Sequence, residues 1–258
     1  MRDLDRAFQP KGLPLWVIVM NEKTSTGSGA VRAGSKSAER RVPATATDAP
    51  PQPAQRRKSK RREQRRSIDT RLAILSAALD EFAERGFDGA SMRRIGERAG
   101  LDFTLITYHF SNKDALWKAV AEWGLGEMLG AEVPANSGLS AKDQVRVEFL
   151  AYFNFTTANP AFHNFMLRSM YGNEERMRWM IDNYLTRIRE SAKPRLVQAQ
   201  ADGEMIEGEP DLLYYIMIGA VSALSSLRGE IELTTGYRLE DPKVQAAFWN
   251  IIERVFFR

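Results

Sequence analysis

Apolar residues recur along most of the chain at the three- and four-residue spacing of amphipathic helices, and no segment alternates with the two-residue period of a half-buried strand. From Ile68 onward this pattern predicts about nine helices and an all-α fold. The first helix is expected from about Asp69 to Arg85. Its core-facing stripe consists of Ile74, Leu75, Ala78, Leu79 and Phe82. Gly86 stands where a left-handed residue commonly ends a helix, and Phe87 is expected to pack back on Phe82.

Two short helices joined by a glycine turn are predicted next. Ser91 is of a type that favours helix N-caps, the helix after it covers residues 92–99, and Gly100 ends it. Asp102 is expected to cap a second short helix that ends near His109. Five apolar residues are expected to hold the pair together: Ile95, Ala99, Leu101, Ile106 and Phe110. This is the helix-turn-helix arrangement, predicted over residues 91–110.

Further helices follow. The fourth is expected to start at Ser111 or Asn112, because Ser111 and Asp114 have the spacing of a capping box, and to run through Val120. Proline, glycine, asparagine and aspartate punctuate the rest of the chain into five helices, expected over residues 141–157, 161–171, 174–201, 211–227 and 241–257. Pro194 lies inside the longest of them and is expected to kink or split it.

The composition excludes several classes of site. The chain has 258 residues, no cysteine and two histidines, His109 and His163. Without cysteine there is no disulfide, thiolate zinc site, iron–sulfur cluster or cysteine nucleophile, and two distant histidines are too few for most metal cages. No run approaches the roughly 18 apolar residues of a membrane span. We therefore expect no metal, no cofactor and no membrane association.

Charge is unevenly distributed along the chain. Residues 1–66 carry 16 basic and 6 acidic side chains, whereas residues 67–258 carry 21 basic and 27 acidic ones. Residues 21–66 contain no aromatic residue and only Val31 and Val42 as larger aliphatic residues, and we expect residues 1–66 to form a disordered basic tail. Its densest segment, residues 56–66, has eight basic residues and one acidic residue. Such a run is either simply solvated or neutralises the phosphates of a polyanion.

The apolar stretch Leu13–Met20 admits more than one interpretation. It could be the apolar part of a signal peptide, but Asp3, Asp5 and Pro14 disfavour that reading. We expect instead either a disordered tail with one apolar patch or a start codon assigned upstream of the true one.

Residues Thr70–Val120 resemble the N-terminal DNA-binding domain of the TetR family of bacterial transcriptional regulators. The resemblance rests on spaced matches at Ala77, Ala78, Phe82, Gly86, Phe87, Ser91, Ile95, Ala99, Gly100, Tyr108, His109, Phe110, Lys113 and Leu116. It implies a DNA-binding domain over residues 67–120, a C-terminal ligand-sensing and dimerisation domain over residues 121–258, and a cytoplasmic protein. It also implies three partners: a double-stranded DNA operator, a small-molecule effector and a second copy of the chain.

A recognition helix in the major groove needs polar side chains on one face and apolar ones on the other. In the second short helix, Thr104, Thr107 and Tyr108 can reach bases or phosphates while Leu105 or Ile106 faces inward. By the resemblance, contacts to the DNA backbone are expected from Ser91, Met92, Arg93, His109 and Lys113.

Some of these positions have alternative interpretations. Tyr108 could be a core residue, and His109 could be a satisfied histidine at the helix end. Many relatives carry a tyrosine at the position of Thr107 and a polar residue at the position of Phe103, so the operator sequence is not predicted.

Aromatic and methionine side chains in the C-terminal part suit a pocket for an apolar or aromatic effector, although at helical spacing they could equally be core residues. The candidate pocket residues are Phe153, His163, Met166, Arg168, Met170, Trp179, Tyr184 and Met217. Among them, Arg168 and His163 are the polar groups that could anchor a carboxylate or a carbonyl.

The last two predicted helices carry more apolar surface than one neighbour would cover. Meeting their copies across a two-fold axis, they would form a four-helix bundle, although packing within the chain is the alternative. The candidate interface residues are Gly219, Ser222, Ala223, Phe248, Ile251, Ile252 and Val255.

The expected function is sequence-specific transcriptional regulation by a repressor that releases its operator when the effector binds. Two alternatives stay open: an architectural DNA-binding protein without a ligand response, and an enzyme with a helical N-terminal domain. The enzyme is disfavoured because the sequence has no thiol, no carboxylate pair beside a histidine and no glycine-rich phosphate loop. We therefore assign no catalytic residues.

Overall fold

The computed structural model of the chain describes residues 53–130 and 137–258. Contacts between residues divide the chain into two units, residues 1–60 and 61–258. Of the described residues, the first unit holds only the N-terminal end of a helix, and the second holds all other elements. The stretch Leu13–Met20 and residues 1–52 of the predicted tail lie outside the described residues.

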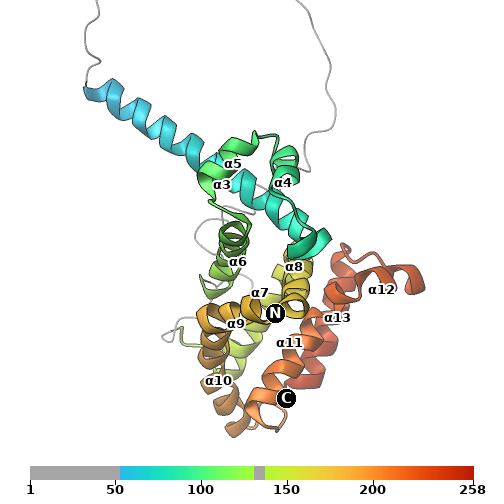
Figure 1. Ribbon diagram of the computed structural model, residues 1–258. Helices are drawn as coiled ribbons and strands as arrows, with labels where there is room; N and C mark the ends of the chain where they lie inside the picture. Colours follow the sequence, from blue (N-terminus) through green and yellow to red (C-terminus); the bar gives the residue numbers. More distant parts are fainter. Residues whose placement is uncertain (1–52, 131–136) are drawn as a thin grey trace, which may run out of the picture. The chain divides into compact units, whose positions relative to one another are not determined.

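The described residues are helical, with one isolated β-bridge between Met205 and Phe257 and no strand, which confirms the all-α prediction (Figure 1). The first helices are α3 (Pro53–Gly89), α4 (Met92–Ala99), α5 (Phe103–His109) and α6 (Lys113–Gly130). They are followed by α7 (Ala141–Ala158), α8 (Pro160–Gly172), α9 (Glu174–Met180), the π-helical segment η1 (Ile181–Leu185) and α10 (Thr186–Ala201). The last are α11 (Pro210–Ser226), α12 (Arg228–Thr235) and α13 (Pro242–Phe256).

Helix α3 begins at Pro53, not near Asp69, and so includes residues 53–66 of the predicted disordered tail. The segment after Pro53 contains no glycine or proline and is rich in arginine, lysine and glutamine, which are good helix formers. The side chains of residues 61–69 are exposed. Disorder was expected because this segment cannot bury apolar side chains. The helix forms without such burial, because its residues have a high intrinsic helix propensity.

Glycines and caps end the helices of the N-terminal part close to the predicted places. At Gly86, φ is 68° and ψ is 179°, which interrupts α3 with the expected positive φ, and the ring of Phe87 stacks on that of Phe82 at 6.1 Å between centroids. Gly100 is left-handed, with φ 67° and ψ 29°, and ends α4. The predicted capping box of Ser111 does not form, because the side chain of Asn112 caps α6 instead.

The C-terminal helices differ from the prediction in two places. Helices α9 and α10 join through η1, so the irregularity of the predicted long helix lies at Ile181–Leu185, and α10 continues past Pro194 without a split. Helix α12 is not predicted by the apolar pattern. Its Leu233 is 89% exposed and its threonines bond back to carbonyls of the same helix, as Thr234 does to Glu230 at 2.7 Å.

Two groups of buried side chains stabilise the described fold. Those of α3 to α6 include Ile74, Leu79, Phe82, Ile95, Ile106, Phe110, Leu116 and Trp117. Those of α7, α10, α11 and α13 form one cluster that includes Val145, Phe149, Phe153, Leu196, Met217, Val221, Trp249 and Ile252. Within the described ranges, no single helix is long and apolar enough to cross a membrane, although α11 and α12 pass that test together as a pair bent by 58°.

Gly124 of α6 permits a close contact with α8. A Cβ built on Gly124 would lie 1.9 Å from the ring of Phe162, which is 4% exposed and held between the rings of Phe155 and Phe165. That ring cannot move aside cheaply, because its neighbours fill the space around it. Gly124 is thus required by the packing of α6 on α8.

We predict that Gly124→Ala lowers the free energy of unfolding by about 1–3 kcal/mol, because the added methyl group overpacks this contact. Gly126→Ala is the matched control on the same helix, since a Cβ there meets nothing within 4 Å. The control is expected to be neutral or slightly stabilising. Urea unfolding of both variants measures the difference, and equal stability of the two would contradict the proposed contact.

Candidate nucleic-acid interface

A buried carboxylate holds the first helix of the helix-turn-helix in place. The side chain of Glu81 in α3 is 1% exposed, and its Oε1 accepts a hydrogen bond from Arg94 Nε of α4 at 2.6 Å. The backbone N–H of Ser91 donates to the same oxygen at 3.3 Å, and guanidinium nitrogens of Arg98 and Arg85 lie 3.6 and 3.7 Å from Oε2. Because a buried carboxylate needs partners, these contacts fix α4 on α3. Arg94 therefore has a structural role.

The second helix is held close to the first. A Cβ on Gly96 would lie 3.0 Å from the carbonyl oxygen of Leu101 and 3.4 Å from the side chain of Ile106. Ile95 and Ile106 are fully buried, so the expectation that Leu105 or Ile106 faces inward is met by Ile106. Asp102 caps α5 by accepting from the backbone N–H of Thr104 at 2.7 Å, and the hydrogen bonds from Thr104 lower the pKa of the Asp102 carboxyl. These contacts fix the orientation of α5.

The outer face of α5 carries exposed side chains that can meet DNA. Thr104 is exposed, and Tyr108 is 82% exposed, so the interpretation of Tyr108 as a core residue is wrong. Phe103 is 49% exposed. Thr107 is half-buried, and its hydroxyl donates to the carbonyl of Thr104 at 2.9 Å. Residues Thr104 and Tyr108 thus form the free part of this face.

The predicted contacts to the DNA backbone lie around the start of α4 and of α6. Ser91 stands at the N-terminus of α4 without a side-chain cap bond, Met92 is half-buried, and Arg93 is exposed and has no ion pair with any described residue. His109 is half-buried and packs edge-on against the ring of Tyr108 at 5.4 Å between centroids. These positions are compatible with phosphate contacts, which stay predictions.

Lys113 is engaged within the protein. Its Nζ donates to the carbonyl of Ala90 at 3.1 Å and lies 4.5 Å from the centroid of the Phe87 ring. Lys113 therefore holds the turn that leads into Ser91. A phosphate contact by Lys113 would have to share the ammonium group with that turn.

The predicted effector residues do not form one site. Phe153 and Met217 belong to the core cluster of the C-terminal helices. His163 is 5% exposed, burial lowers its pKa, and its Nε2 lies 2.8 Å from Ser226 Oγ, so it is a neutral, satisfied side chain and not an anchor for an anion. Trp179 packs on Tyr184 of η1 at 5.7 Å and on Trp117 of α6 at 5.8 Å between centroids.

The three remaining effector candidates belong to α8. Met166 is half-buried, Met170 is 36% exposed, and Arg168 is exposed. Of the whole predicted set, Arg168 alone lines the cavity formed by the end of α3, α6, α8 and the start of α9, which holds about 340 Å³. The other seven lie outside that cavity lining.

The predicted interface residues divide into two groups. Gly219, Ile251 and Val255 are exposed, and Ala223 is half-buried. Ser222 and Ile252 are buried at 8% and 5% exposure within the chain, so they are not available to a partner, and Phe248 stacks on Phe153 at 5.8 Å. The exposed face of α11 also includes residues that the sequence reading did not select, namely Leu212, Tyr215 and Ile216.

The junction of α3 and α6 with α8 and α9 was missed by sequence reasoning. The ring of Phe165 in α8 lies 6.2 Å from that of Phe82 and 5.6 Å from that of Trp117 between centroids. Arg176 of α9 lies over the Phe87 ring at 3.7 Å. Arg176 stands in a polar segment with no signal of this role, whereas Glu81 could have been found as a charged residue on the apolar stripe of α3.

Comparison with known proteins gives a family match in this part of the chain. Residues 74–120 match the model of the bacterial regulatory proteins of the tetR family. The HTH-type transcriptional regulator RutR of Escherichia coli (strain K12) is 50% identical over 48 residues, which are 19% of this chain and 23% of RutR. The HTH-type transcriptional repressor AcnR of Corynebacterium diphtheriae is 42% identical over 69 residues, 27% of this chain and 35% of AcnR. The chain thus spans about a quarter to a third of these curated relatives.

The fold extends the similarity beyond the matched segment. The ketosteroid transcriptional regulator KstR2 of Mycobacterium tuberculosis superposes with a TM-score of 0.59 at 18% identity, over 73% of this chain and 95% of KstR2. At this identity the likeness concerns the fold alone.

We predict that Glu81→Gln destabilises the protein by about 1–3 kcal/mol, because it leaves Arg94 and Arg98 with a weaker partner at a desolvated site. Glu84→Gln is the control. Glu84 also pairs with Arg98, at 2.6 Å, but its side chain is 54% exposed, and exposed pairs contribute little. Thermal and urea unfolding compare the variants, and a Glu81→Gln protein no less stable than Glu84→Gln would rule out the anchoring role.

Proposed function

We propose, from the match of residues 74–120 to the model of the bacterial regulatory proteins of the tetR family, that the chain is a transcriptional repressor whose operator affinity changes when a small molecule binds its C-terminal helices. The observation that carries the proposal is the exposed face of α5, held by the Glu81 contacts. Ile106 is buried while Thr104 and Tyr108 point outward. A helix of this kind can read base edges in the major groove.

The basic end of α3 supports a second, less specific contact with DNA. Arg61, Arg62, Arg65 and Arg66 are exposed on a helix that continues into the DNA-binding domain. Arginines on such a helix neutralise phosphates whatever the base sequence, and so add affinity that falls steeply with salt. Base recognition is assigned to α5 and phosphate neutralisation to this arm.

The proposed assembly is a homodimer through α11 and α13. Tyr215 and Ile216 of α11 are 61% and 59% exposed, and Ile251 and Val255 of α13 are 60% and 51% exposed. Apolar side chains in such a concentration on two neighbouring helices suit burial against a second copy. A two-fold dimer would also present two recognition helices to successive half-sites.

We predict a preference of roughly 10³-fold or more for DNA from the promoter region of the gene over scrambled DNA of equal composition. Fluorescence anisotropy titrations at physiological salt measure both affinities. Equal affinities would reject a specific regulator and favour the architectural alternative.

The same titrations separate the two kinds of contact. Replacing Thr104 and Tyr108 together by alanine is expected to reduce the preference by about ten- to a hundredfold, because base discrimination is lost. Replacing Arg65 and Arg66 by alanine is the counterpart. It is expected to weaken both DNAs alike and to flatten the salt slope by about two units.

For the dimer, we predict that Ile251→Asp with Val255→Asp halves the mass in solution at micromolar concentration, because each charge would be buried against the partner. The control is Val197→Asp on α10, where the valine is 46% exposed, close to the 51% of Val255. Sedimentation equilibrium measures the mass. A wild-type protein that is already monomeric would refute the dimer.

A further inference from the structure

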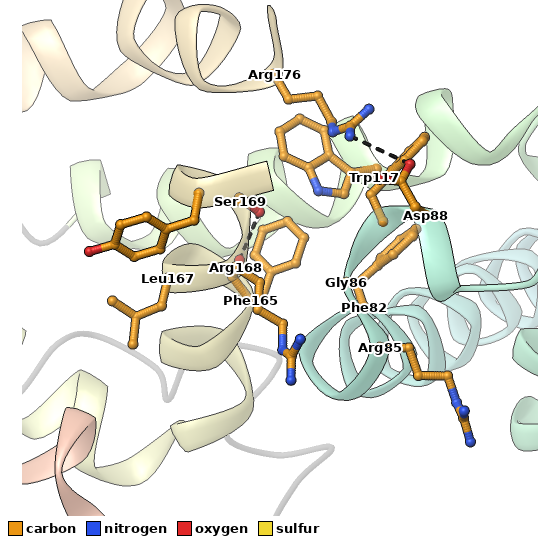
Figure 2. Close-up of a pocket in the computed structure, with 12 residues that line it drawn as sticks. Phe82, Arg85, Gly86, Asp88, Trp117, Phe165, Leu167, Arg168, Ser169 and Arg176 are labelled. Carbon is orange, nitrogen blue, oxygen red and sulfur yellow. Dashed lines mark hydrogen bonds and ion pairs between the residues drawn. The ribbon is translucent and has the colours of Figure 1, made fainter. Parts of the chain in front are cut away.

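A cavity lies where α3 and α6 meet α8 and α9. It holds about 340 Å³, at the lower end of the range for small-molecule sites, about 300–1,000 Å³. Its walls on one side come from the end of α3, the turn at Gly86 to Asp88, and Trp117 of α6. On the other side they come from Phe165 to Tyr171 of α8 and from Arg176 of α9 (Figure 2).

The apolar part of the cavity is aromatic. Phe82, Trp117 and Phe165 line it, and all three are nearly fully buried, with 1% exposure each. The rings lie 5.6 to 6.2 Å from one another between centroids where Phe165 meets the other two. Because these rings pack on one another, a ligand meets only the parts of them that line the cavity, and such an aromatic lining favours an apolar or ring-containing ligand.

The charged part of the cavity is basic. Three arginines line it, Arg85, Arg168 and Arg176, against one carboxylate, Asp88. Arg176 is occupied, since it lies over the Phe87 ring and 4.0 Å from Asp88 Oδ1. Arg85 lies 3.7 Å from Glu81. Arg168 has neither a hydrogen bond nor an ion pair with the described residues.

Figure 2 shows the positions of these groups. Arg176 comes down from α9 beside Trp117 toward Asp88, while Arg168 leaves α8 near Phe165, on the side of the cavity where Arg85 leaves α3. Arg168 therefore stands at the mouth of an aromatic cavity with its donors unused. A guanidinium in this position suits a carboxylate, which it can bind with two parallel hydrogen bonds.

We propose that this cavity binds an aromatic carboxylate, with its ring against the parts of Phe82, Trp117 and Phe165 that line the cavity and its carboxylate on Arg168. As the effector site of the regulator, the proposal rests on the proposed function, but binding itself does not require it. The occupant would contact both the DNA-binding helices and the C-terminal helices, so its binding is linked to their relative arrangement.

The turn at Gly86 to Asp88 connects the cavity to the DNA-binding face. Asp88 faces Arg176 across the cavity, and Lys113 holds the same turn through the carbonyls of Asp88 and Ala90, at 3.4 and 3.1 Å. Ser91, which starts α4, follows directly. A ligand that shifts this turn would shift the start of α4.

The test uses two probes of nearly the same shape, the charged 2-naphthylacetate and its neutral amide, 2-naphthylacetamide. Isothermal titration calorimetry on the full chain is expected to give an affinity for the acid about tenfold or more above that for the amide, as a charge-assisted hydrogen-bond pair would provide. Equal affinities, or no binding of the acid at about 1 mM, would overturn the proposal.

Variants locate the site. Arg168→Met is expected to lower the affinity for the acid about tenfold and to leave the amide unchanged. Arg187→Met is the control, because Arg187 is an exposed arginine of α10 that does not line the cavity. Both variants are first checked for wild-type thermal unfolding. An Arg168→Met protein that binds the acid as the wild type does, or an Arg187→Met protein that loses it, contradicts the assignment.

The DNA titrations distinguish this inference from the proposed function. Probe binding that depends on Arg168, in a protein without preference for its promoter DNA, would uphold the cavity and reject the regulator. A preference for promoter DNA in a protein that does not bind the acid would uphold the regulator and reject the cavity as a binding site. If both hold, the acid is expected to change the operator affinity of the wild type and not that of Arg168→Met.

Discussion

The buried carboxylate of Glu81 is the interaction on which the helix-turn-helix depends. At 1% exposure its charge must be compensated within the protein. Besides Arg85 of α3 itself, the compensating groups come from the segment that has to be positioned: Arg94 and Arg98 of α4 and the N–H of Ser91 at its start. An apolar contact would let α4 slide or rotate, whereas charge-assisted hydrogen bonds fix both its distance and its direction. Because α5 packs closely on α4 at Gly96, fixing the position of α4 also fixes the position of α5.

The helix that carries Glu81 also faces the C-terminal helices. Phe82, the next residue, packs on Phe87 and Phe165. One helix therefore contacts α4 through a carboxylate and α8 through an aromatic ring, on adjacent positions of the same turn. A shift of α8 relative to α3 would therefore act on Phe82, which is next in sequence to Glu81, the residue that holds α4. This adjacency makes the junction a reasonable place for a ligand to act.

Sequence reasoning was most accurate where local chemistry determines the structure. Gly100 and Asp102 act as predicted because a positive φ and an N-cap depend on one or two residues. It was least accurate where the outcome depends on which helices become neighbours. The apolar pattern marks Phe153 and Met217 as inward-facing but cannot say whether they line a pocket or fill a core, and here they fill the core.

The same limit applies to charged residues and to the basic arm. Arg94, Arg168 and Arg176 look alike in the sequence, yet one anchors a helix, one stands free at a cavity mouth and one lies over a ring. Only their distant partners distinguish them. For residues 53–66 the prediction of disorder was wrong. The low apolar content of this segment indicates that its side chains are not buried, but it does not exclude a helix.

The helical arm has a consequence for how salt acts on this protein. Arg61 and Arg65, and likewise Arg62 and Arg66, are four residues apart on an exposed helix, where like charges oppose helix formation. Packing does not offset that repulsion, since these side chains are exposed. Phosphates would remove it, so DNA that neutralises the arm also stabilises its helix. Salt screens both effects, so it would weaken the proposed attraction of the arm to DNA while it reduces the repulsion between the arginines of the free arm. The proposed interaction with DNA and the internal repulsion of the arm would thus decline together as salt rises.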